Sequence, residues 1–220
     1  MSVLIQKGKA PEGAVRISRE EAIKLQWKLV LDWKPASDVW PFRYGVASLA
    51  IGSAISGIMI ASHFRRKLKL KDIGRIAMYL PNVVIPSLAL PILHQKLVSE
   101  PILIQADCPV CIQLRSIVLQ NAIGLVYPLI LTPLSGYLLA STFATTRLPL
   151  LSYTNLGSLI NVYRGIIEPF TTRLMALSIF HTVLAIAITE SEAKSLFKIQ
   201  KILYDKLDVD SEPLPISQNS

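Results

Sequence analysis

The sequence predicts an all-α, polytopic membrane protein with four transmembrane helices, and two observations support this. Of the 220 residues, 51% are hydrophobic and only 17% are charged, too few charges for an ordinary soluble domain. The charges are also segregated, because Asp, Glu, Lys and Arg are absent from residues 44–64, 76–95, 116–146 and 174–189. A helix needs about 20 apolar residues to cross the hydrocarbon core, so four spans are expected, the last one lengthened by its flanking residues.

Three parts follow from this pattern along the chain. We expect an N-terminal surface helix region at residues 1–41, a four-span membrane domain at 42–190, and a C-terminal helix with a disordered tail at 191–220. The four residues that begin at Ser18 read Ser-Arg-Glu-Glu, a capping box that predicts a helix to about Trp33. Residues 1–17 before it are expected to be unstructured, and short amphipathic helices are expected at both ends.

The first span, at about residues 44–63, carries small residues at four-residue spacing. One row contains Gly52 and Ser56, and a second contains Gly57. Rows of small residues let helices approach closely. We therefore expect these positions to pack tightly, either inside the bundle or against another chain.

The connector after the first span, residues 64–75, is the most basic segment of the chain. Phe64 closes the span, and Arg65 and Arg66 follow it. Basic connectors set topology by the positive-inside rule, and they also attract anionic lipid headgroups; both interpretations remain open. The net charge of +8 does not indicate nucleic-acid binding, because the Lys and Arg residues flank spans and lie beside no nucleic-acid motif.

Prolines interrupt the second and third spans, which are expected to be kinked or broken. The second contains Pro81, Pro86 and Pro91, and the third contains Pro128 and Pro133. Each proline removes a backbone donor and clashes with the preceding turn. We take the third span as the central helix, running from about residue 113 to about residue 139, with Asp107 capping the helix N-terminus.

An amphipathic interfacial helix is expected within residues 147–172, before the fourth span. A separate charged helix is expected at residues 191–207. An even number of spans places both termini on one side. The cysteine-containing loop should share that side, opposite the basic connector.

Cys108 and Cys111 are the only cysteines and form a CxxC pair at the start of a helix. A structural disulfide or plain thiols, redox catalysis, and metal binding are the three alternatives. Redox relays in membranes pass electrons between two cysteine pairs, and this chain has one. A zinc site needs about four ligands, whereas His63, His94 and His181 belong in or beside three different spans.

No motif for an enzyme of known chemistry is present. Paired intramembrane carboxylates, a nucleophile elbow and nucleotide-binding glycine loops are absent from the sequence. A transporter would be expected to carry intramembrane charge, which the spans lack. We therefore expect no catalytic or metal site, no cofactor, no small-molecule substrate and no nucleic-acid partner.

An ordered set of short motifs is spread over about residues 42–190: Phe64-Arg65-Arg66, Arg75-Ile76-Ala77, Leu80-Pro81, Ile85-Pro86, Asp107-Cys108-x-x-Cys111, Arg115-Ser116, Gly124 and Tyr127-Pro128. In this order the motifs resemble the transmembrane protein 126 family. The Asp-Cys-x-x-Cys motif resembles the family branch linked to the distal module of the membrane arm. Ser135-Gly136-Tyr137 departs from the Asn-Gly step that the family tends to have there.

The resemblance implies a non-enzymatic chaperone that is a multi-pass protein of the mitochondrial inner membrane. Such an assembly factor binds membrane-arm subunits of respiratory complex I, other assembly factors and inner-membrane lipid. The implied packing or interaction residues are those of the family motifs together with the small-residue rows: Gly52, Ser56, Gly57, Phe64, Arg65, Arg66, Arg115, Tyr127 and Pro128. A Cys108–Cys111 disulfide would be compatible with the oxidising intermembrane space. The alternative function is a thiol–disulfide or quinone-linked redox protein that uses this pair.

Overall fold

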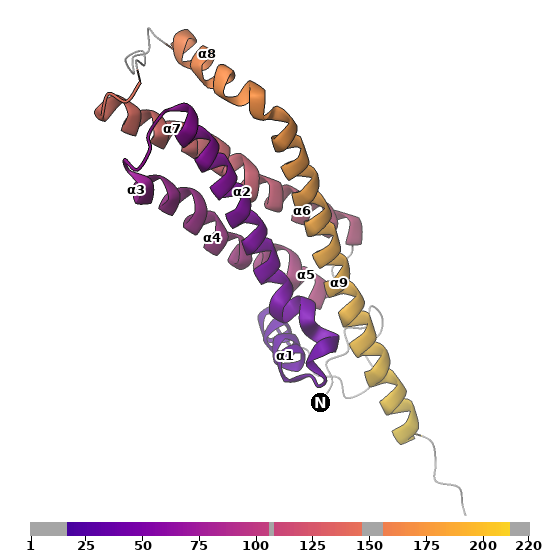
Figure 1. The fold of residues 1–220 in the computed structure, drawn as a ribbon. Coiled ribbons are helices and arrows are strands. Elements are labelled where there is room, and N and C mark those ends of the chain that lie inside the picture. Colours follow the sequence, from indigo (N-terminus) through magenta and orange to yellow (C-terminus); the bar gives the residue numbers. More distant parts are fainter. Residues whose placement is uncertain (1–16, 106–107, 147–155, 212–220) are drawn as a thin grey trace, which may run out of the picture.

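The computed structural model describes residues 17–105, 108–146 and 156–211, which form an elongated helical bundle without strands (Figure 1). Four helical segments are long and apolar enough to cross a membrane: Pro41–Lys67, Arg75–Leu103, Pro109–Thr142 and Gly157–Asp205. The predicted all-α class with four spans is therefore confirmed. The expectations for the first 16 and last nine residues, and for Asp107 as a cap, lie outside the described residues.

The elements follow one another along the chain with short connections. The α-helices are α1 (Arg19–Asp32), α2 (Val46–Lys67), α3 (Arg75–Tyr79), α4 (Ile85–His94), α5 (Glu100–Leu103), α6 (Pro109–Asn121), α7 (Tyr127–Thr142), α8 (Leu156–Ile167) and α9 (Thr171–Ser211). Short 3₁₀ segments are η1 (Ala36–Val39) and η7 (Glu168–Phe170), and π-helical turns are η2 (Pro41–Gly45), η3 (Leu80–Val84), η4 (Gln95–Ser99) and η5 (Ala122–Val126).

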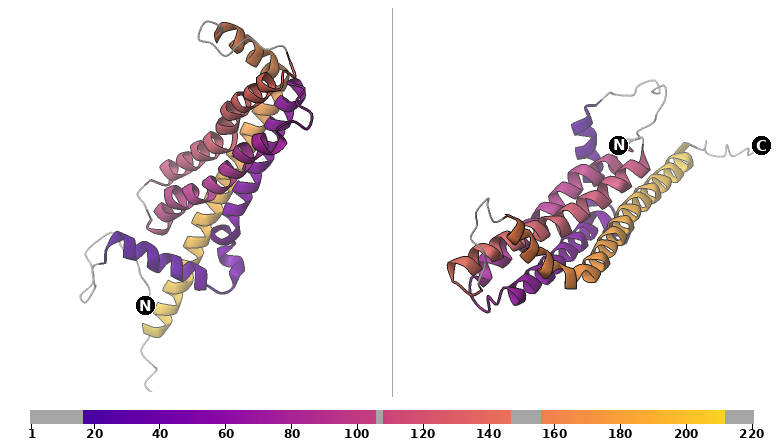
Figure 2. Two further views of the ribbon diagram at one scale, coloured as in Figure 1. Left: turned by 90° about the vertical axis from the view of Figure 1, so that its left-hand side faces the viewer. Right: turned by 90° about the horizontal axis from the view of Figure 1, so that it is seen from above.

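The capping box that opens α1 is present as the sequence predicts. The Ser18 hydroxyl accepts the backbone N–H of Glu21 at 3.3 Å, and the Glu21 carboxylate accepts the backbone N–H of Ser18 at 3.1 Å. The helix lies across the end of the bundle, as two further views show (Figure 2). It buries Val30 in an apolar cluster with Leu103 of α5 and Ile199 of α9.

The central helix of the bundle is α2, so the assignment of the third span to that place is wrong. In the apolar window of the first span 44% of the residues are buried, compared with 22 to 28% in the other three. Helix α2 contacts α4, α7, α9 and the turns η3 and η5. The small residues of α2 allow this many close neighbours, whereas the third span has larger side chains exposed along its length.

The second and third spans remain helical throughout, and π-helical turns interrupt the α-helix near several of their prolines. Pro81 is the second residue of η3, Pro86 is the second residue of α4 directly after it, and Pro128 is the second residue of α7 directly after η5. Pro91 and Pro133 lie inside α4 and α7. A π turn contains one additional residue and shifts the hydrogen-bond register, which accommodates the missing proline donor without exposing the chain. The third span accordingly runs from Pro109 to Thr142, longer at both ends than expected.

The fourth span and the predicted C-terminal helix are one helix, α9, which corrects the expected break at residue 191. Helix α9 runs without interruption from Thr171 to Ser211. Its sequence contains no glycine or proline, and Glu190 and Lys194 form an i,i+4 ion pair of 2.8 Å across the expected break. The predicted interfacial helix before it corresponds to α8 and η7, and residues 147–155 lie outside the described part.

The two ends of the bundle differ. Helix α1, the start of α6 with its cysteine pair, and the last turns of α9 lie at one end, which we call the cysteine end (Figure 1). The α2–α3 connection and α8 lie at the other, which we call the basic end. The expectation for the two termini themselves lies outside the described residues. A separate apolar cluster closes each end: Val30, Val39, Phe42, Val98, Ile102, Leu103, Ile112, Leu196 and Ile199 at the first, and Ile60, Phe64, Leu68, Leu70, Met78, Leu125, Ala140, Phe170 and Leu177 at the second.

Candidate functional site

The small-residue rows of α2 pack inside the bundle, which decides between the two possibilities left open by the sequence. A Cβ atom added to Gly52 would lie 2.9 Å from Leu184 of α9. One added to Gly57 would lie 2.5 Å from the backbone oxygen of Asn82 in η3. Both glycines therefore allow a neighbouring helix to approach more closely than any side chain would permit.

A hydrogen-bonded chain of polar groups crosses the bundle beside these glycines. The Gln120 amide nitrogen donates to Nδ1 of His181 at 2.8 Å, and Nε2 of His181 lies 2.6 Å from the Ser56 hydroxyl. The Ser56 hydroxyl in turn donates to the carbonyl of Gly52 at 3.1 Å. Because Nδ1 of His181 accepts a hydrogen bond, the imidazole hydrogen is on Nε2 and is donated to the Ser56 hydroxyl. The three hydrogen bonds therefore run in one direction, from Gln120 to the carbonyl of Gly52. These three buried side chains fasten α2, α6 and α9 to one another.

Gly124 of η5 makes room for the histidine ring in this chain. A Cβ atom added there would lie 2.7 Å from Cε1 of His181. The ring cannot move aside freely because both of its nitrogens are bonded. Gly124, one of the family motif positions, thus belongs to the same constellation as Ser56 and Gln120.

Further polar contacts join α6 to α9 on either side of His181. Asn121 bonds Ser178 at 3.0 Å through its amide oxygen and Thr182 at 3.1 Å through its nitrogen. Nearer the cysteine end, the Thr189 hydroxyl donates to Ser116 at 2.8 Å. Such bonds have no competition from water inside a bilayer, so they fix the register of the two helices.

A buried carboxylate lies where η4 meets α9. Ser99 donates its hydroxyl to the two carboxylate oxygens of Glu192 at 3.0 and 3.2 Å, and Nε2 of His94 lies 3.5 Å from the same carboxylate. All three side chains are almost fully buried. The group lies toward the cysteine end of the bundle and holds η4 against α9.

Cys108 and Cys111 are bonded to each other as a disulfide at the N-terminus of α6. Cys108 is the N-cap residue, and its sulfur accepts the backbone N–H of Cys111 at 3.2 Å. Cys111 is exposed, so the bond can be reached from outside the bundle. Chemically, such a pair can pin the first turn of α6 or exchange with an external dithiol.

The residues at the end of α2 divide into an inward and an outward group. Phe64 is fully buried and stacks near Tyr163 of α8, with ring centroids 6.1 Å apart. Arg65 is also buried and donates to the backbone carbonyls of Lys71 and Ile73 in the following loop. Arg66 is exposed and bonds the carbonyl of Ser62 in its own helix.

Two of the other motif residues donate hydrogen bonds to backbone carbonyls of a neighbouring segment, and the third lies near the start of a helix. Arg115 donates to the carbonyl of Leu97 in η4 at 3.2 Å. The Tyr127 hydroxyl, at the start of α7, donates to the carbonyl of Pro81 in η3 at 3.4 Å. Buried Pro128 is the second residue of α7, directly after the π turn η5.

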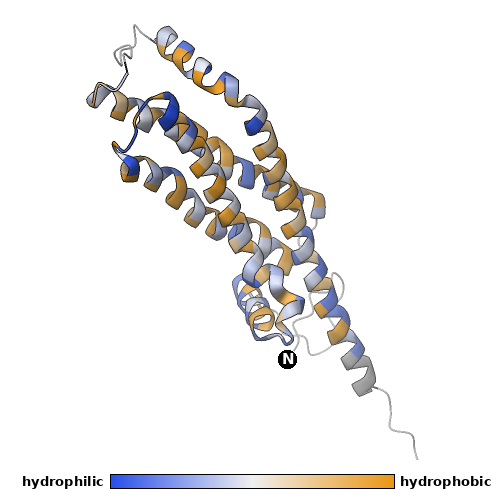
Figure 3. Cartoon of the chain, viewed as in Figure 1, coloured by the Kyte–Doolittle hydropathy of each residue, from blue (hydrophilic) through white to orange (hydrophobic). Residues whose placement is uncertain are grey.

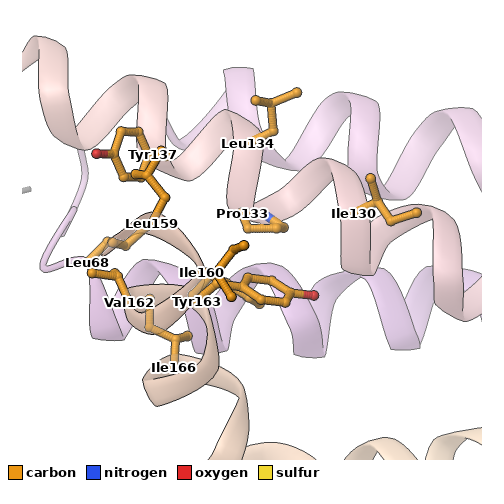
Figure 4. A pocket seen from close by; sticks show the side chains of 11 residues that line it. Leu68, Ile130, Pro133, Leu134, Tyr137, Leu159, Ile160, Val162, Tyr163 and Ile166 are labelled. Atoms are coloured by element: carbon orange, nitrogen blue, oxygen red, sulfur yellow. The ribbon is translucent and has the colours of Figure 1, made fainter. Parts of the chain in front are cut away.

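Two hollows with mainly apolar linings open on the bundle surface. One, of about 370 Å³, lies between α7, α8 and the end of α2, and its lining includes Ile130, Pro133 and Tyr163 (Figure 4). The second, of about 350 Å³, lies beside the cysteine pair, between Ile112 of α6 and Phe197 of α9.

Metal-ligating side chains are dispersed through the part of the chain that the structure describes, where no three of His, Cys, Asp and Glu form a group. His63 bonds the carbonyl of Ile166 at 2.8 Å and stacks on Phe170. His94 and His181 have the separate partners given above. The described histidines are therefore packing residues at three levels of the bundle.

Sequence reasoning missed Gln120, Ser99 and Glu192. A signal for the first existed, because the polar residues Gln113, Ser116 and Gln120 recur every three or four positions in the third span. Such a stripe marks the face of a helix that meets other protein.

Comparison with known proteins gives a consistent result. The transmembrane protein 126 family model matches residues 23–204. "Transmembrane protein 126" of Drosophila melanogaster is 34% identical over 208 residues, covering 93% of each chain. "Transmembrane protein 126A" of Mus musculus is 28% identical, and that of Rattus norvegicus 27%, each over 80% of this chain and 87% of the relative. No solved structure matches. The chain belongs to the transmembrane protein 126 family.

Proposed function

We propose that this membrane protein is a non-enzymatic assembly factor of the mitochondrial inner membrane. It binds membrane-arm subunits of respiratory complex I, together with other assembly factors, and holds them while the complex is built. Family membership supports the proposal through the properties that the resemblance implies.

The observation that carries the proposal is that the polar side chains within the bundle bond one another, while an apolar hollow stays open on its surface. Ser56, Gln120 and His181 bond one another and tie the spans together. The hollow between α7 and α8 is lined by apolar and aromatic side chains. Fixed helices beside an open apolar hollow suit a protein that docks an apolar helix of a partner.

Deletion of the protein should lower complex I selectively, with membrane-arm intermediates accumulating on native gels. Affinity capture from detergent-solubilised membranes should recover membrane-arm subunits. Normal complex I after deletion would refute the proposal.

A pair of single variants tests the hollow between α7 and α8. Ile130→Trp fills it from α7, and we expect recovery of membrane-arm subunits to fall at least about tenfold. The matched control is Ile92→Trp on α4, where the isoleucine is 59% exposed, close to the 65% of Ile130, but lies outside the hollow. Equal recovery with both variants would show that the partner docks elsewhere.

A second candidate function is favoured by the exposed disulfide and the apolar hollow next to it. In this function the protein is a thiol–disulfide or quinone-linked redox protein, in which the disulfide accepts two electrons from a dithiol and a quinone accepts them in turn. Cys108→Ser and Cys111→Ser would then each abolish function as fully as deletion. Full restoration of complex I by the double variant would exclude it and leave the assembly factor.

A further inference from the structure

A basic hollow of about 850 Å³ lies between the end of α2 and the start of α3. Its lining consists of Ser62, Arg65, Arg66, Lys69, Lys71, Arg75 and Tyr79, so five of its lining residues are basic and none is acidic. Hydrophilic residues gather visibly at this turn, at the outer ends of two otherwise apolar helices (Figure 3). The nearby Asp72 pairs with Arg75 at 3.0 Å and leaves the other cations without a neighbouring acid in the lining.

The loop that carries the cations is held in place from two sides. On the side facing the bundle, the buried Arg65 side chain donates to the carbonyls of Lys71 and Ile73. From the segment that follows α7, Thr145 and Thr146 donate to the carbonyl of Leu68 at 3.0 and 3.2 Å. A fixed loop loses little freedom when a ligand binds, so the cations are preorganised.

A role in setting membrane topology does not by itself account for the positions of Lys69 and Lys71. Cations in the last turn of α2 would be expected there, because they complement the helix dipole. Lys69 and Lys71 lie beyond the helix, at backbone φ angles of 52° and 44°. This left-handed backbone is costly for a lysine, yet it turns both residues into the hollow that Arg66 also lines. Like charges brought together repel, and a bound anion relieves that repulsion.

The site of the hollow indicates which anion is bound. It lies between the ends of two candidate spans, Pro41–Lys67 and Arg75–Leu103, at the expected membrane boundary. Ser62 and Tyr79, whose hydroxyl groups are 2.8 Å apart, line it from those two spans.

An exposed apolar stripe runs along α2 from the hollow toward the middle of the bilayer. From Ser62 it continues through Ile58, Ile55 and Ile51, at spacings of three or four residues. Their side chains are 47, 46 and 60% exposed. An acyl chain can lie along this stripe, whereas a free phosphate ion gains nothing from it.

We propose that this hollow binds the phosphate headgroup of an anionic membrane lipid, and that one acyl chain follows the Ile58–Ile55–Ile51 stripe. The exposed cations Arg66, Lys69 and Lys71 contact the phosphate. The site goes beyond the assembly function and does not depend on it.

Native mass spectrometry of the full chain in detergent tests the site. We add phosphatidic acid, phosphatidylcholine with the same acyl chains, or glycerol 3-phosphate. Phosphatidic acid should bind at least about tenfold more tightly than phosphatidylcholine, since each Lys or Arg near a headgroup attracts its charge. Glycerol 3-phosphate, which lacks acyl chains, should not displace it at equal concentration.

A triple variant and a charge-matched control separate a site from general attraction. Arg66→Gln, Lys69→Gln and Lys71→Gln together should remove the preference for phosphatidic acid, while leaving the buried Arg65 in place. The control combines Lys24→Gln, Lys28→Gln and Lys201→Gln, which removes the same charge from exposed positions at the cysteine end. Equal losses in the two variants would overturn the proposal. Competition by glycerol 3-phosphate as strong as by the lipid would overturn the lipid assignment.

Discussion

The two ends of the bundle hold their turns in a similar way but present different charge. At the cysteine end, Arg43 donates to the carbonyls of Leu31 and Trp33. At the basic end, Arg65 does the same for the loop after α2. A guanidinium suits this task because its several donors can satisfy two carbonyls at once.

The remaining charges distinguish the ends. Near the cysteine end Lys198 pairs with Asp38, and Lys194 pairs with Glu190. At the basic end Arg66, Lys69 and Lys71 line a hollow that has no acidic residue. At the cysteine end, two lysines of α9 are thus paired with carboxylates. The basic end offers positive charge, which suits a phosphate.

The largest effect is expected from Arg65→Ala at the basic end. This change leaves two loop carbonyls without their donor and a space beneath the loop, and should lower the free energy of unfolding by about 2–4 kcal/mol. Hydrogen exchange should rise in residues 69–74 and stay unchanged in α1.

The neighbouring Arg66→Ala is the control, because its exposed side chain bonds only within α2 among the described residues. Equal destabilisation by both variants would mean that the loop is not held by Arg65.

A smaller effect is expected from Ser99→Ala toward the cysteine end. The Glu192 carboxylate then loses its hydroxyl donor inside the protein, which should cost about 1–3 kcal/mol. Thermal unfolding in detergent measures the change. Ser191→Ala, whose exposed hydroxyl bonds a carbonyl of its own helix, should change stability by much less. An unchanged thermal unfolding curve for Ser99→Ala would show that the contact does not contribute to stability.

The smallest effect is expected at the ion pair between η1 and α9. The hydrogen bond from Lys198 holds the pKa of the Asp38 carboxyl below its ordinary value of 3.8. Because the folded-state pKa is the lower one, the contact stabilises the protein above that ordinary value and is lost as the pH falls through the folded-state pKa.

The difference in melting temperature between the native chain and Lys198→Met should therefore be present near neutral pH and vanish in acid. Lys201→Met, an exposed lysine on the next turn of α9, provides the comparison. A difference that does not change with pH would exclude the Asp38 pairing as its cause.

The sequence predicts the number of spans, the capping box of α1 and the placement of the cysteine pair opposite the basic connector, because each depends on local composition. It misplaces the central helix, since burial of α2 depends on how Gly52 and Gly57 meet α9 and η3. It also divides α9 at a group of charges that instead form an i,i+4 pair along one continuous helix.

The candidate site shows the same limit. Ser56 of the small-residue row and Gly124 of the family motifs can be selected from sequence, but their common partner cannot, because His181 lies 125 residues after Ser56. Only packing brings the two together. The π turns are a similar case, since prolines predict an irregularity without specifying its hydrogen-bond register.

The contact between Gly124 and His181 couples the residues that these two positions can accept. Any side chain at 124 collides with a ring that both Ser56 and Gln120 hold in place. Enlarging Gly124 alone pushes against that ring, and losing the histidine alone removes the partner that Ser56 and Gln120 share. The two residues should therefore change together rather than one at a time.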